Sequence, residues 1–237
     1  MQAEYQSPES RTAAIEGSYS YTESEGRSLG KSQRANTAPS EFFRYRMIKR
    51  CCDVFLVLIS MPITLPILGI LSAVVMLSSP GPIFYCQERV GENGRWFTLY
   101  KFRSMRIDAE QGTPVWAKEK DDRVTRLGRF LRFTRLDELP QLWNVLRGDM
   151  SFVGPRPERP FFVQQLAAAI PFYNERHAVK PGVTGWAQVK YRYGASIEDA
   201  YEKLRYDLYY IKHLSLAFDL TIAIDTVKVI LSGKGAK

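Results

Sequence analysis

The chain has 237 residues, 45% of them apolar, with 33 Lys plus Arg against 25 Asp plus Glu and a net charge of +8. This length indicates one domain, or one domain with an appendage, and the apolar fraction is sufficient for a core. A disordered polyelectrolyte and a membrane protein with many spans are both excluded.

Residues 1–43 are the first segment, and they are polar. Four basic and six acidic residues give them a local charge of −2, so the remainder of the chain carries +10. Ile15 and Leu29 are the only large aliphatic residues among the first forty, too few to offset the entropy lost on ordering. We expect a disordered tail, without the apolar stretch of a secretory signal or the acid-poor composition of a transit peptide.

Residues 54–79 are 26 consecutive residues without a charge, mostly Val, Leu, Ile, Met and Ala. At about 1.5 Å per residue, a helix of this length crosses a hydrocarbon core of about 30 Å. Pro62 and Pro66 lie four residues apart within it. Each removes a main-chain donor, at a cost of about 3 kcal/mol in a soluble helix. We therefore expect the helix to break there, with Ser60 and Thr64 binding some of the freed main-chain groups.

Basic residues flank this run on both sides. They are Arg44, Arg46, Lys49 and Arg50 before it, and Arg89, Arg95, Lys101, Arg103 and Arg106 after it. The positive-inside rule places both flanks in the cytoplasm, which a single crossing cannot do. A broken helix that enters one leaflet and returns satisfies both flanks, and a kinked helix that crosses the membrane remains the alternative.

The residues that follow predict a small β element and several helices. Ser79-Pro80-Gly81-Pro82 is a turn, and residues 83–87 and 96–100 are short strands around a second turn at 91–94. Apolar spacing predicts helices at residues 135–147, 161–170, 200–210 and 216–231. The last helix carries a few charges, so it lies on the membrane or packs against a partner. The sequence thus predicts an α+β, mostly helical protein that rests on a membrane.

Cysteine and histidine give little indication of a site. Cys51, Cys52 and Cys86 have no second pair and no histidine at ligand spacing, so neither a zinc site nor a disulfide framework is supported. His177 and His213 are not accompanied by a nucleophile elbow. The chain also has no Walker loop and no dinucleotide-binding glycine motif.

Arginine occurs at every third position from residue 123 to residue 135, as Arg123, Arg126, Arg129, Arg132 and Arg135. On a helix a three-residue step drifts by about 60°, so these side chains sweep round the helix and do not line one face. The first three are as consistent with a surface that faces solvent or lipid headgroups as with a site. The last two approach the carboxylates that follow.

Those carboxylates are Asp137 and Glu138. Adjacent acids are common on helix surfaces, but near guanidinium groups two carboxylates can hold a hard divalent cation. Cations can also keep one carboxylate ionised for attack on an electrophilic phosphorus. In residues 154–160 the prolines hold Arg156 in a defined direction, and a rigid guanidinium suits phosphate oxygens. These parts predict phosphoryl chemistry at a membrane surface.

Six short motifs carry a resemblance to a known family. They are Lys49-Arg50 with Asp53, Gln87 to Gly91, Tyr100 to Met105, Leu136 to Gln141, Gly148 to Pro157, and Lys180 to Gln188. In this order they are similar to the bacterial sugar transferase family, the monotopic polyprenyl-phosphate phosphoglycosyl transferases. The resemblance covers residues 45–235 and leaves the N-terminal tail outside.

The resemblance implies that a sugar 1-phosphate moves from a UDP-sugar to undecaprenyl phosphate with release of UMP, which initiates exopolysaccharide or O-antigen synthesis. Asp137 is the catalytic nucleophile that this implies, forming a covalent phosphosugar intermediate. Glu138 assists it through Mg²⁺ or by positioning, so both carboxylates are the implied metal ligands. The positions implied to bind phosphate or to stabilise developing charge are Lys101, Arg103, Arg132 and Arg156.

The resemblance also implies how the chain is arranged. A tail at 1–43 precedes a transferase domain at 44–237, which includes a re-entrant membrane helix at 54–79 broken at Pro62 and Pro66. The small catalytic domain, with membrane-surface amphipathic helices, is expected on the cytoplasmic face of the bacterial inner membrane. The family often has Ser-Pro at the break, whereas this chain has Leu65-Pro66, so the hydroxyl next to the break is missing.

The implied partners are the UDP-sugar and undecaprenyl phosphate, with a homodimer or downstream glycosyltransferases as further partners and no nucleic acid. Tyr191, Arg192, Tyr193 and residues 195–202 resemble relatives that transfer a hexose phosphate. This favours glucose or galactose over an N-acetylated sugar.

A protein of another class fits the same charge pattern. Each Lys or Arg near an anionic leaflet contributes about 1 kcal/mol, so a charge of +10 outside the tail suffices for a non-catalytic membrane-anchored protein that binds anionic lipid or nucleic acid. Asp137 separates the two, because a covalent mechanism needs its carboxylate and phosphate binding does not.

Overall fold

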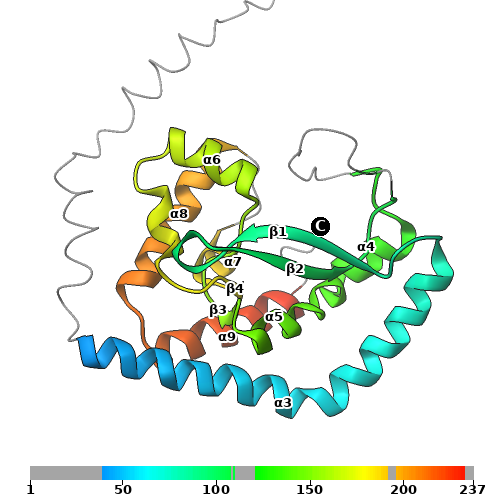
Figure 1. The fold of residues 1–237 in the computed structure, drawn as a ribbon, viewed down its shortest axis with the longest axis horizontal. Coiled ribbons are helices and arrows are strands. Elements are labelled where there is room, and N and C mark those ends of the chain that lie inside the picture. Colours follow the sequence, from blue (N-terminus) through cyan, green and yellow to red (C-terminus); the bar gives the residue numbers. More distant parts are fainter. Residues whose placement is uncertain (1–38, 108, 110–120, 192–195, 233–237) are drawn as a thin grey trace, which may run out of the picture. The chain divides into compact units, whose positions relative to one another are not determined.

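The computed structural model describes residues 39–107, 109, 121–191 and 196–232. In this part of the chain most residues are helical and a few short strands lie between the helices (Figure 1), which confirms the mostly helical α+β class. Residues 1–38 of the predicted tail lie outside the described residues. The first helix among the described residues begins at Pro39, so residues 39–43, which we expected in the tail, are helical.

Helix α3 (Pro39–Ser78) is 40 residues long and contains both prolines. The predicted break is wrong, because α3 remains helical throughout and instead changes direction in its middle part (Figure 1). The predicted hydroxyl contacts are also wrong. Ser60 Oγ donates to Val57 O at 2.8 Å and Thr64 Oγ1 to Ser60 O at 3.0 Å, and neither carbonyl lies four residues before a proline. Both prolines and such hydroxyl bonds bend helices.

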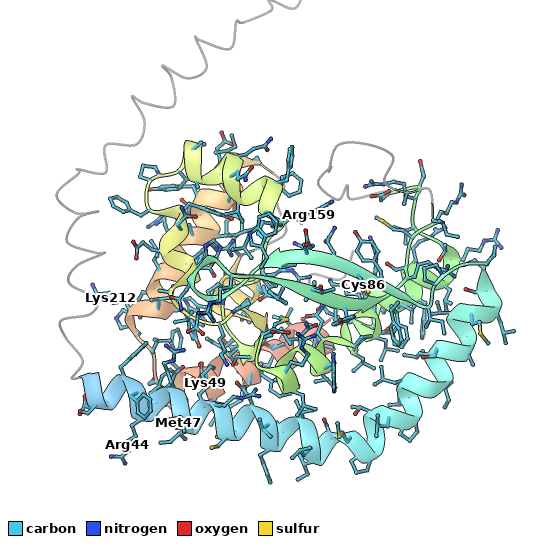
Figure 2. The ribbon with its side chains drawn as sticks, in the orientation of Figure 1. Arg44, Met47, Lys49, Cys86, Arg159 and Lys212 are labelled. Carbon is cyan, nitrogen blue, oxygen red and sulfur yellow. The ribbon has the colours of Figure 1, made fainter. Side chains whose placement is uncertain are left out.

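α3 leaves most of its apolar side chains exposed. By length and composition it is long and apolar enough to cross a membrane, and only 11% of its most apolar window is buried. The core helix of a soluble protein would be mostly buried. Near the start of α3, Figure 2 shows Lys49 on the side that faces helix α9 (Leu216–Leu231), whereas Arg44 and Met47 point away from the rest of the protein.

Strands β1 (Phe84–Val90) and β2 (Trp96–Phe102) form an antiparallel hairpin, paired from Phe84 opposite Phe102 to Val90 opposite Trp96. Both predicted strands are confirmed, and each extends farther than predicted. The turn between them, η1 (Glu92–Gly94), has Asn93 at φ 56° and Gly94 at φ 75°, a left-handed region that these two residue types tolerate. Lys101 lies near the end of β2, so the hairpin carries one of the predicted phosphate-binding residues.

A second sheet, which was not predicted, pairs β3 (Ser151–Val153) in parallel with β4 (Gly182–Thr184). Two glycines permit the close approach of these segments. A Cβ at Gly182 would lie 2.1 Å from the main-chain nitrogen of Gly154, and a Cβ at Gly154 would lie 2.4 Å from Lys180 O. The main chain that leaves β3, which carries Arg156, is therefore fixed against β4.

The remaining helices are α4 (Arg126–Phe133), η2 (Leu136–Glu138), α5 (Gln141–Arg147), α6 (Pro160–Ala169), η3 (Tyr173–Ala178), α7 (Trp186–Lys190) and α8 (Ile197–Lys212). Helices α6, α8 and α9 confirm the predictions at 161–170, 200–210 and 216–231. The prediction of a single helix at 135–147 is wrong. There η2 and α5 are separate, because Pro140 precedes α5 as its N-cap and proline cannot continue the hydrogen bonding of a preceding turn.

α3 is attached to the rest of the described chain on both sides of its bend. Near its start Lys49 Nζ donates to Asp219 of α9 at 2.7 Å, and farther on Val57 packs against an apolar cluster from β2 and α5. Near its end Leu71 and Val75 pack against side chains of β2 and α4. The elements that carry the predicted site residues therefore rest directly on α3.

Candidate active site

The Asp137-Glu138 pair lies in a tight turn between two helices. After α4 ends, Arg135 adopts φ 59°, a left-handed conformation that costs a non-glycine residue about 1–3 kcal/mol. Leu136 and Leu139 pack against the apolar cluster of α3, β2 and α4. Because these two leucines lie on either side of the carboxylates in the chain, the turn presents Asp137 and Glu138 from a fixed main chain.

Glu138 is held by two cations from other segments. Its Oε1 accepts hydrogen bonds from Lys101 Nζ at 2.8 Å and from Arg156 Nη2 at 2.6 Å, and its side chain is 10% exposed. Burial by itself would raise the pKa of Glu138, but the charges of Arg156 and Lys101 lower it well below its usual value. Glu138 is therefore ionised, and it brings two of the predicted phosphate-binding residues together.

Asp137 is buried beside this cluster. Among the residues that the structure describes, no donor forms a hydrogen bond with the carboxylate of Asp137. The two nearby cations, Lys101 and Arg156, bind Glu138. Burial raises the pKa of Asp137. The charge of Lys101 opposes this shift, and that of Glu138 adds to it. A carboxylate with such surroundings is available to act as a nucleophile or as a metal ligand.

The other two predicted phosphate-binding residues have different contacts. Arg132 of α4 donates from Nε to Ser104 Oγ at 2.9 Å, and its charge also acts on Asp137. Arg103 is buried and donates from Nη1 to Pro80 O at 2.9 Å and from Nη2 to the preceding carbonyl at 2.7 Å. Arg103 thus binds the main chain that follows α3, and its role in phosphate binding stays a prediction.

The sequence model of the family described as bacterial sugar transferase matches residues 44–233. The chain belongs to the bacterial sugar transferase family. The matched range contains every residue of the cluster around Glu138.

Three curated proteins show the range of similarity within this family. A protein of Aeromonas hydrophila named UDP-N-acetylgalactosamine-undecaprenyl-phosphate N-acetylgalactosaminephosphotransferase is 44% identical over 209 residues, which are 88% of this chain and 49% of that protein. A protein of Escherichia coli K12 named UDP-glucose:undecaprenyl-phosphate glucose-1-phosphate transferase is 41% identical over 77% of this chain and 40% of its own length. The Exopolysaccharide production protein PSS of Rhizobium leguminosarum is 39% identical, over 80% of this chain and 98% of its own length. The chain thus spans about half or less of the first two proteins and nearly all of the third.

The sugar transferase family implies Mg²⁺ at the carboxylate pair, and the donor set fits this ion. Asp137 offers oxygens that no described residue binds, whereas Glu138 Oε1 is bound by two cations. Within the described ranges there is no group of three or more His, Cys, Asp or Glu side chains that could hold a metal. Mg²⁺ is commonly held by one or two carboxylates together with substrate phosphates and water, so Asp137 and Glu138 suffice as protein ligands.

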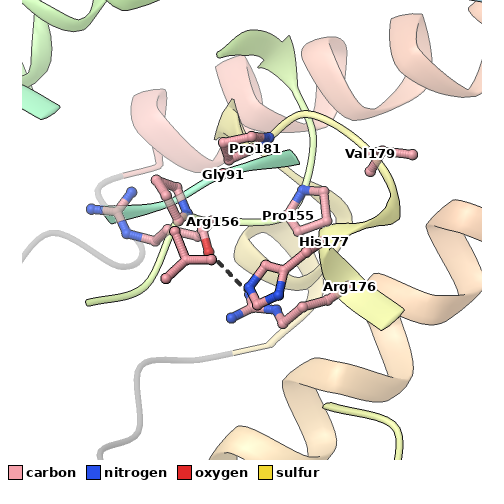
Figure 3. A pocket seen from close by; sticks show the side chains of 9 residues that line it. Gly91, Pro155, Arg156, Arg176, His177, Val179 and Pro181 are labelled. Carbon is pink, nitrogen blue, oxygen red and sulfur yellow. Dashed lines mark hydrogen bonds between the residues drawn. The ribbon is translucent and has the colours of Figure 1, made fainter. Parts of the chain in front are cut away.

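Sequence reasoning missed the residues that hold Arg156 in place. Arg176 of η3 donates to the carbonyl of Arg156 at 3.0 Å (Figure 3). It also donates to Asp207 of α8 at 2.7 Å. Arg89 donates to the carbonyl of Pro157 at 3.1 Å. Arg89 belongs to the motif at 87–91, one of the six that carry the family resemblance, so the sequence did mark this residue. Arg176 and Asp207 lie on different helices, and no spacing in the sequence connects them.

Proposed function

We propose that this protein transfers a sugar 1-phosphate from a UDP-sugar to undecaprenyl phosphate and so starts a repeat unit of exopolysaccharide or O-antigen. The names of its relatives support these substrates and this process. The observation that carries the proposal is the buried carboxylate of Asp137 next to Glu138, Lys101 and Arg156. An anionic nucleophile and cations for phosphate are thus present in one place.

In the first step, a carboxylate oxygen of Asp137 attacks the β-phosphorus of the UDP-sugar. A bond forms between this oxygen and phosphorus, the bond from phosphorus to the bridging oxygen breaks, and UMP leaves with the electron pair. Lys101 and Arg156 neutralise the charge that develops on the phosphate oxygens. The side chain of Arg156 is 42% exposed while it is bound to Glu138, so it can meet substrate without leaving its carboxylate.

In the second step, a phosphate oxygen of undecaprenyl phosphate attacks the phosphorus of the aspartyl phosphosugar. The bond from phosphorus to Asp137 breaks, which regenerates the carboxylate and releases the lipid diphosphate sugar. Glu138 keeps Lys101 and Arg156 in place through both steps. Mg²⁺, when bound at the two carboxylates, supplies further neutralisation of the diphosphate charge.

The proposal includes a re-entrant α3 in the bacterial inner membrane, with the site on the cytoplasmic face. α3 is attached to the catalytic elements on both sides of its bend, through Lys49 to Asp219 and through Leu71 and Val75 to β2 and α4. A straight crossing would separate the two ends by about 30 Å of hydrocarbon, with the catalytic elements on one side only. The double attachment therefore supports a re-entrant helix over one that crosses.

The donor sugar stays a prediction. The names of the relatives divide between N-acetylgalactosamine and glucose, and our preference for glucose or galactose rests on residues 191–202. Tyr191 Oη donates to Asp199 Oδ1 at 2.8 Å, whereas residues 192–195 lie outside the described residues. Release of UMP from a panel of UDP-sugars, with undecaprenyl phosphate present, identifies the donor. A homodimer and contacts with downstream glycosyltransferases also stay predictions.

Replacement of Asp137 tests the function. Asp137→Asn keeps the size of the side chain but removes the nucleophilic carboxylate, so we expect UMP release to fall at least about a thousandfold while the protein still sediments with membranes. The control is the same change at Asp225 of α9, which pairs with Lys190 and Lys228 and should keep normal turnover. Near-normal turnover by Asp137→Asn would exclude this nucleophile. Absence of UMP release by the wild-type protein with every UDP-sugar would favour the alternative, a non-catalytic protein that binds anionic lipid.

The covalent intermediate has its own measurement. Without undecaprenyl phosphate, the wild-type protein should release an amount of UMP equal to that of the protein and retain a radiolabelled sugar phosphate after denaturation. Asp137→Asn should do neither. A label attached to another residue, or turnover without any labelled protein, would contradict the two-step route.

A further inference from the structure

The main chain around Arg156 is held at every carbonyl from Pro155 to Glu158. Pro155 O accepts from Gly182 N at 2.9 Å and Glu158 O from Val90 N at 2.9 Å. The two carbonyls between them accept from arginine side chains at 3.0 and 3.1 Å. Pro155 and Pro157 have no N–H to donate, so only two of these four residues carry a main-chain donor. The carbonyls are held by donors from other elements, two of them main-chain N–H groups and two of them arginine side chains.

Arg176 is the donor to the carbonyl of Arg156, and it is itself fixed. Its Nε and Nη2 donate to Asp207 Oδ2 at 3.1 and 2.7 Å, and its Nη1 donates to Tyr173 Oη at 2.8 Å. The side chains of Arg176 and Asp207 are 9% and 2% exposed. Replacing a buried ion pair by apolar side chains of similar volume is often neutral or stabilising. Stability alone therefore does not explain why a guanidinium is directed at this carbonyl.

We propose that Arg176, oriented by Asp207, is a positioning residue for the transfer reaction. It fixes the main chain of Arg156, and the side chain of Arg156 then reaches Glu138 at 2.6 Å. Figure 3 shows Arg176 and Arg156 side by side, joined at the carbonyl. This inference rests on the proposed function, because the guanidinium of Arg156 is assigned there to the substrate diphosphate. Arg176 itself does not touch substrate.

Arg176→Lys is the decisive variant. A lysine keeps the charge opposite Asp207, but a single ammonium on a flexible stem cannot reproduce the planar fork that serves three partners. Misplacement by about 1 Å can cost about a hundredfold in rate, so we expect kcat for UMP release to fall about 10-fold to 100-fold, with a smaller change in KM. The matched control is Arg205→Lys on the exposed surface of α8, where the arginine pairs with Glu202. It should leave kcat unchanged.

A double-mutant cycle separates positioning from a general structural role. In an Arg156→Ala protein the main chain is still held, but there is no guanidinium to direct. If Arg176 acts through Arg156, adding Arg176→Lys to Arg156→Ala should cause less than about a twofold further loss, since coupled residues are not additive. Equal losses in both backgrounds, or full activity of Arg176→Lys alone, would overturn the proposal.

Hydrogen exchange gives a readout that does not depend on catalysis. In Arg176→Lys, peptides that cover residues 154–159 should exchange faster than in the wild type, while Arg205→Lys should match the wild type. Unchanged exchange in Arg176→Lys would overturn the positioning role. If the wild-type protein released no UMP from any UDP-sugar, the proposed function would fail, and the exchange result would still show whether Arg176 holds this segment.

Discussion

Asp137 and Glu138 adjoin each other in the chain, yet their charges have opposite effects on the folded state. Glu138 accepts charged hydrogen bonds from Lys101 and Arg156, whereas burial raises the pKa of Asp137. We expect Glu138→Gln to lower the free energy of unfolding by about 2 kcal/mol, since hydrogen bonds to charged groups contribute about 1.5–3 kcal/mol. Asp137→Asn should unfold at the wild-type temperature or above it. Thermal unfolding in one detergent compares the two variants.

The pH dependence of these variants checks the same argument. The pKa of Glu138 is lowered on folding, so its stabilisation is present above its ordinary value of 4.5 and is lost as the pH falls through the lower folded value. The pKa of Asp137 is raised, so its protonated form stabilises the protein at low pH, and this stability is lost as the pH rises from 3.8 through the raised value. Glu138→Gln should remove the loss of stability that Glu138 causes as the pH falls. Asp137→Asn should remove the loss that Asp137 causes as the pH rises. Identical pH profiles for both variants would contradict the assignment.

Single residues differ in how far the sequence could predict them. Asp137, Glu138 and Arg156 could be predicted, because adjacent carboxylates and a proline-flanked arginine are visible in the chain itself. Arg103 donates to main-chain carbonyls, and the composition of the chain could not predict these contacts. Arg176 could not be predicted, since its orientation depends on Asp207, which lies 31 positions later in the chain. Contacts between distant segments are therefore the part of the site that the sequence leaves open.

At the scale of elements, α4 lies directly against the main chain of Ser104. A Cβ at Gly128 would lie 1.9 Å from Ser104 O and 2.7 Å from its carbonyl carbon, and α4 also carries Arg132, which binds Ser104 Oγ. We expect Gly128→Ala to destabilise the protein by about 1–2 kcal/mol, because overpacking at the upper end of its usual range, about 3 kcal/mol, outweighs the gain of about 1 kcal/mol in helix propensity. Loss of transferase activity should accompany it, since α4 would move away from Ser104.

Gly69→Ala is the matched control, because Gly69 lies in α3 and no described atom is found within 4 Å of a Cβ built there. This variant should unfold at the wild-type temperature or slightly above it. Thermal unfolding of both proteins measures the difference. If Gly128→Ala were as stable as Gly69→Ala, the close approach of α4 to Ser104 would not be real.

Elements could be predicted where a pattern runs over several turns. The apolar spacing of α6, α8 and α9 extends over 10 to 16 residues, which is long enough to show a helical period. β3 and β4 have three residues each, too few for any period. At 135–147 the apolar spacing continues across Pro140, although this proline divides the segment into η2 and α5. The prolines of α3 predicted a departure from a straight helix, but the sequence does not show whether the helix breaks or only bends there.

At the scale of the whole molecule, a re-entrant α3 predicts that both of its flanks lie in the cytoplasm. Ser40 and Cys86 are exposed positions before and after the membrane run. We expect a Ser40→Cys reporter, with Cys51, Cys52 and Cys86 replaced by Ala, to react with a membrane-impermeant maleimide in inside-out vesicles and not in spheroplasts. A protein that retains only Cys86 should behave in the same way. Reaction of one reporter in spheroplasts and of the other in inside-out vesicles would show that α3 crosses the membrane.

Leu136 and Leu139, on either side of the Asp137-Glu138 pair, pack into the same cluster as Leu71 and Val75 of α3. With α3 embedded as proposed, the depth of its insertion sets the height of Asp137 above the lipid phosphates. A protein on one flexible stem would sample many orientations over the membrane, whereas attachment on both sides of a bend leaves few. An acceptor lipid that diffuses in the leaflet then meets the carboxylate of Asp137 at one fixed height. A soluble enzyme must find the right orientation at every encounter, whereas here the orientation is fixed once, when α3 inserts.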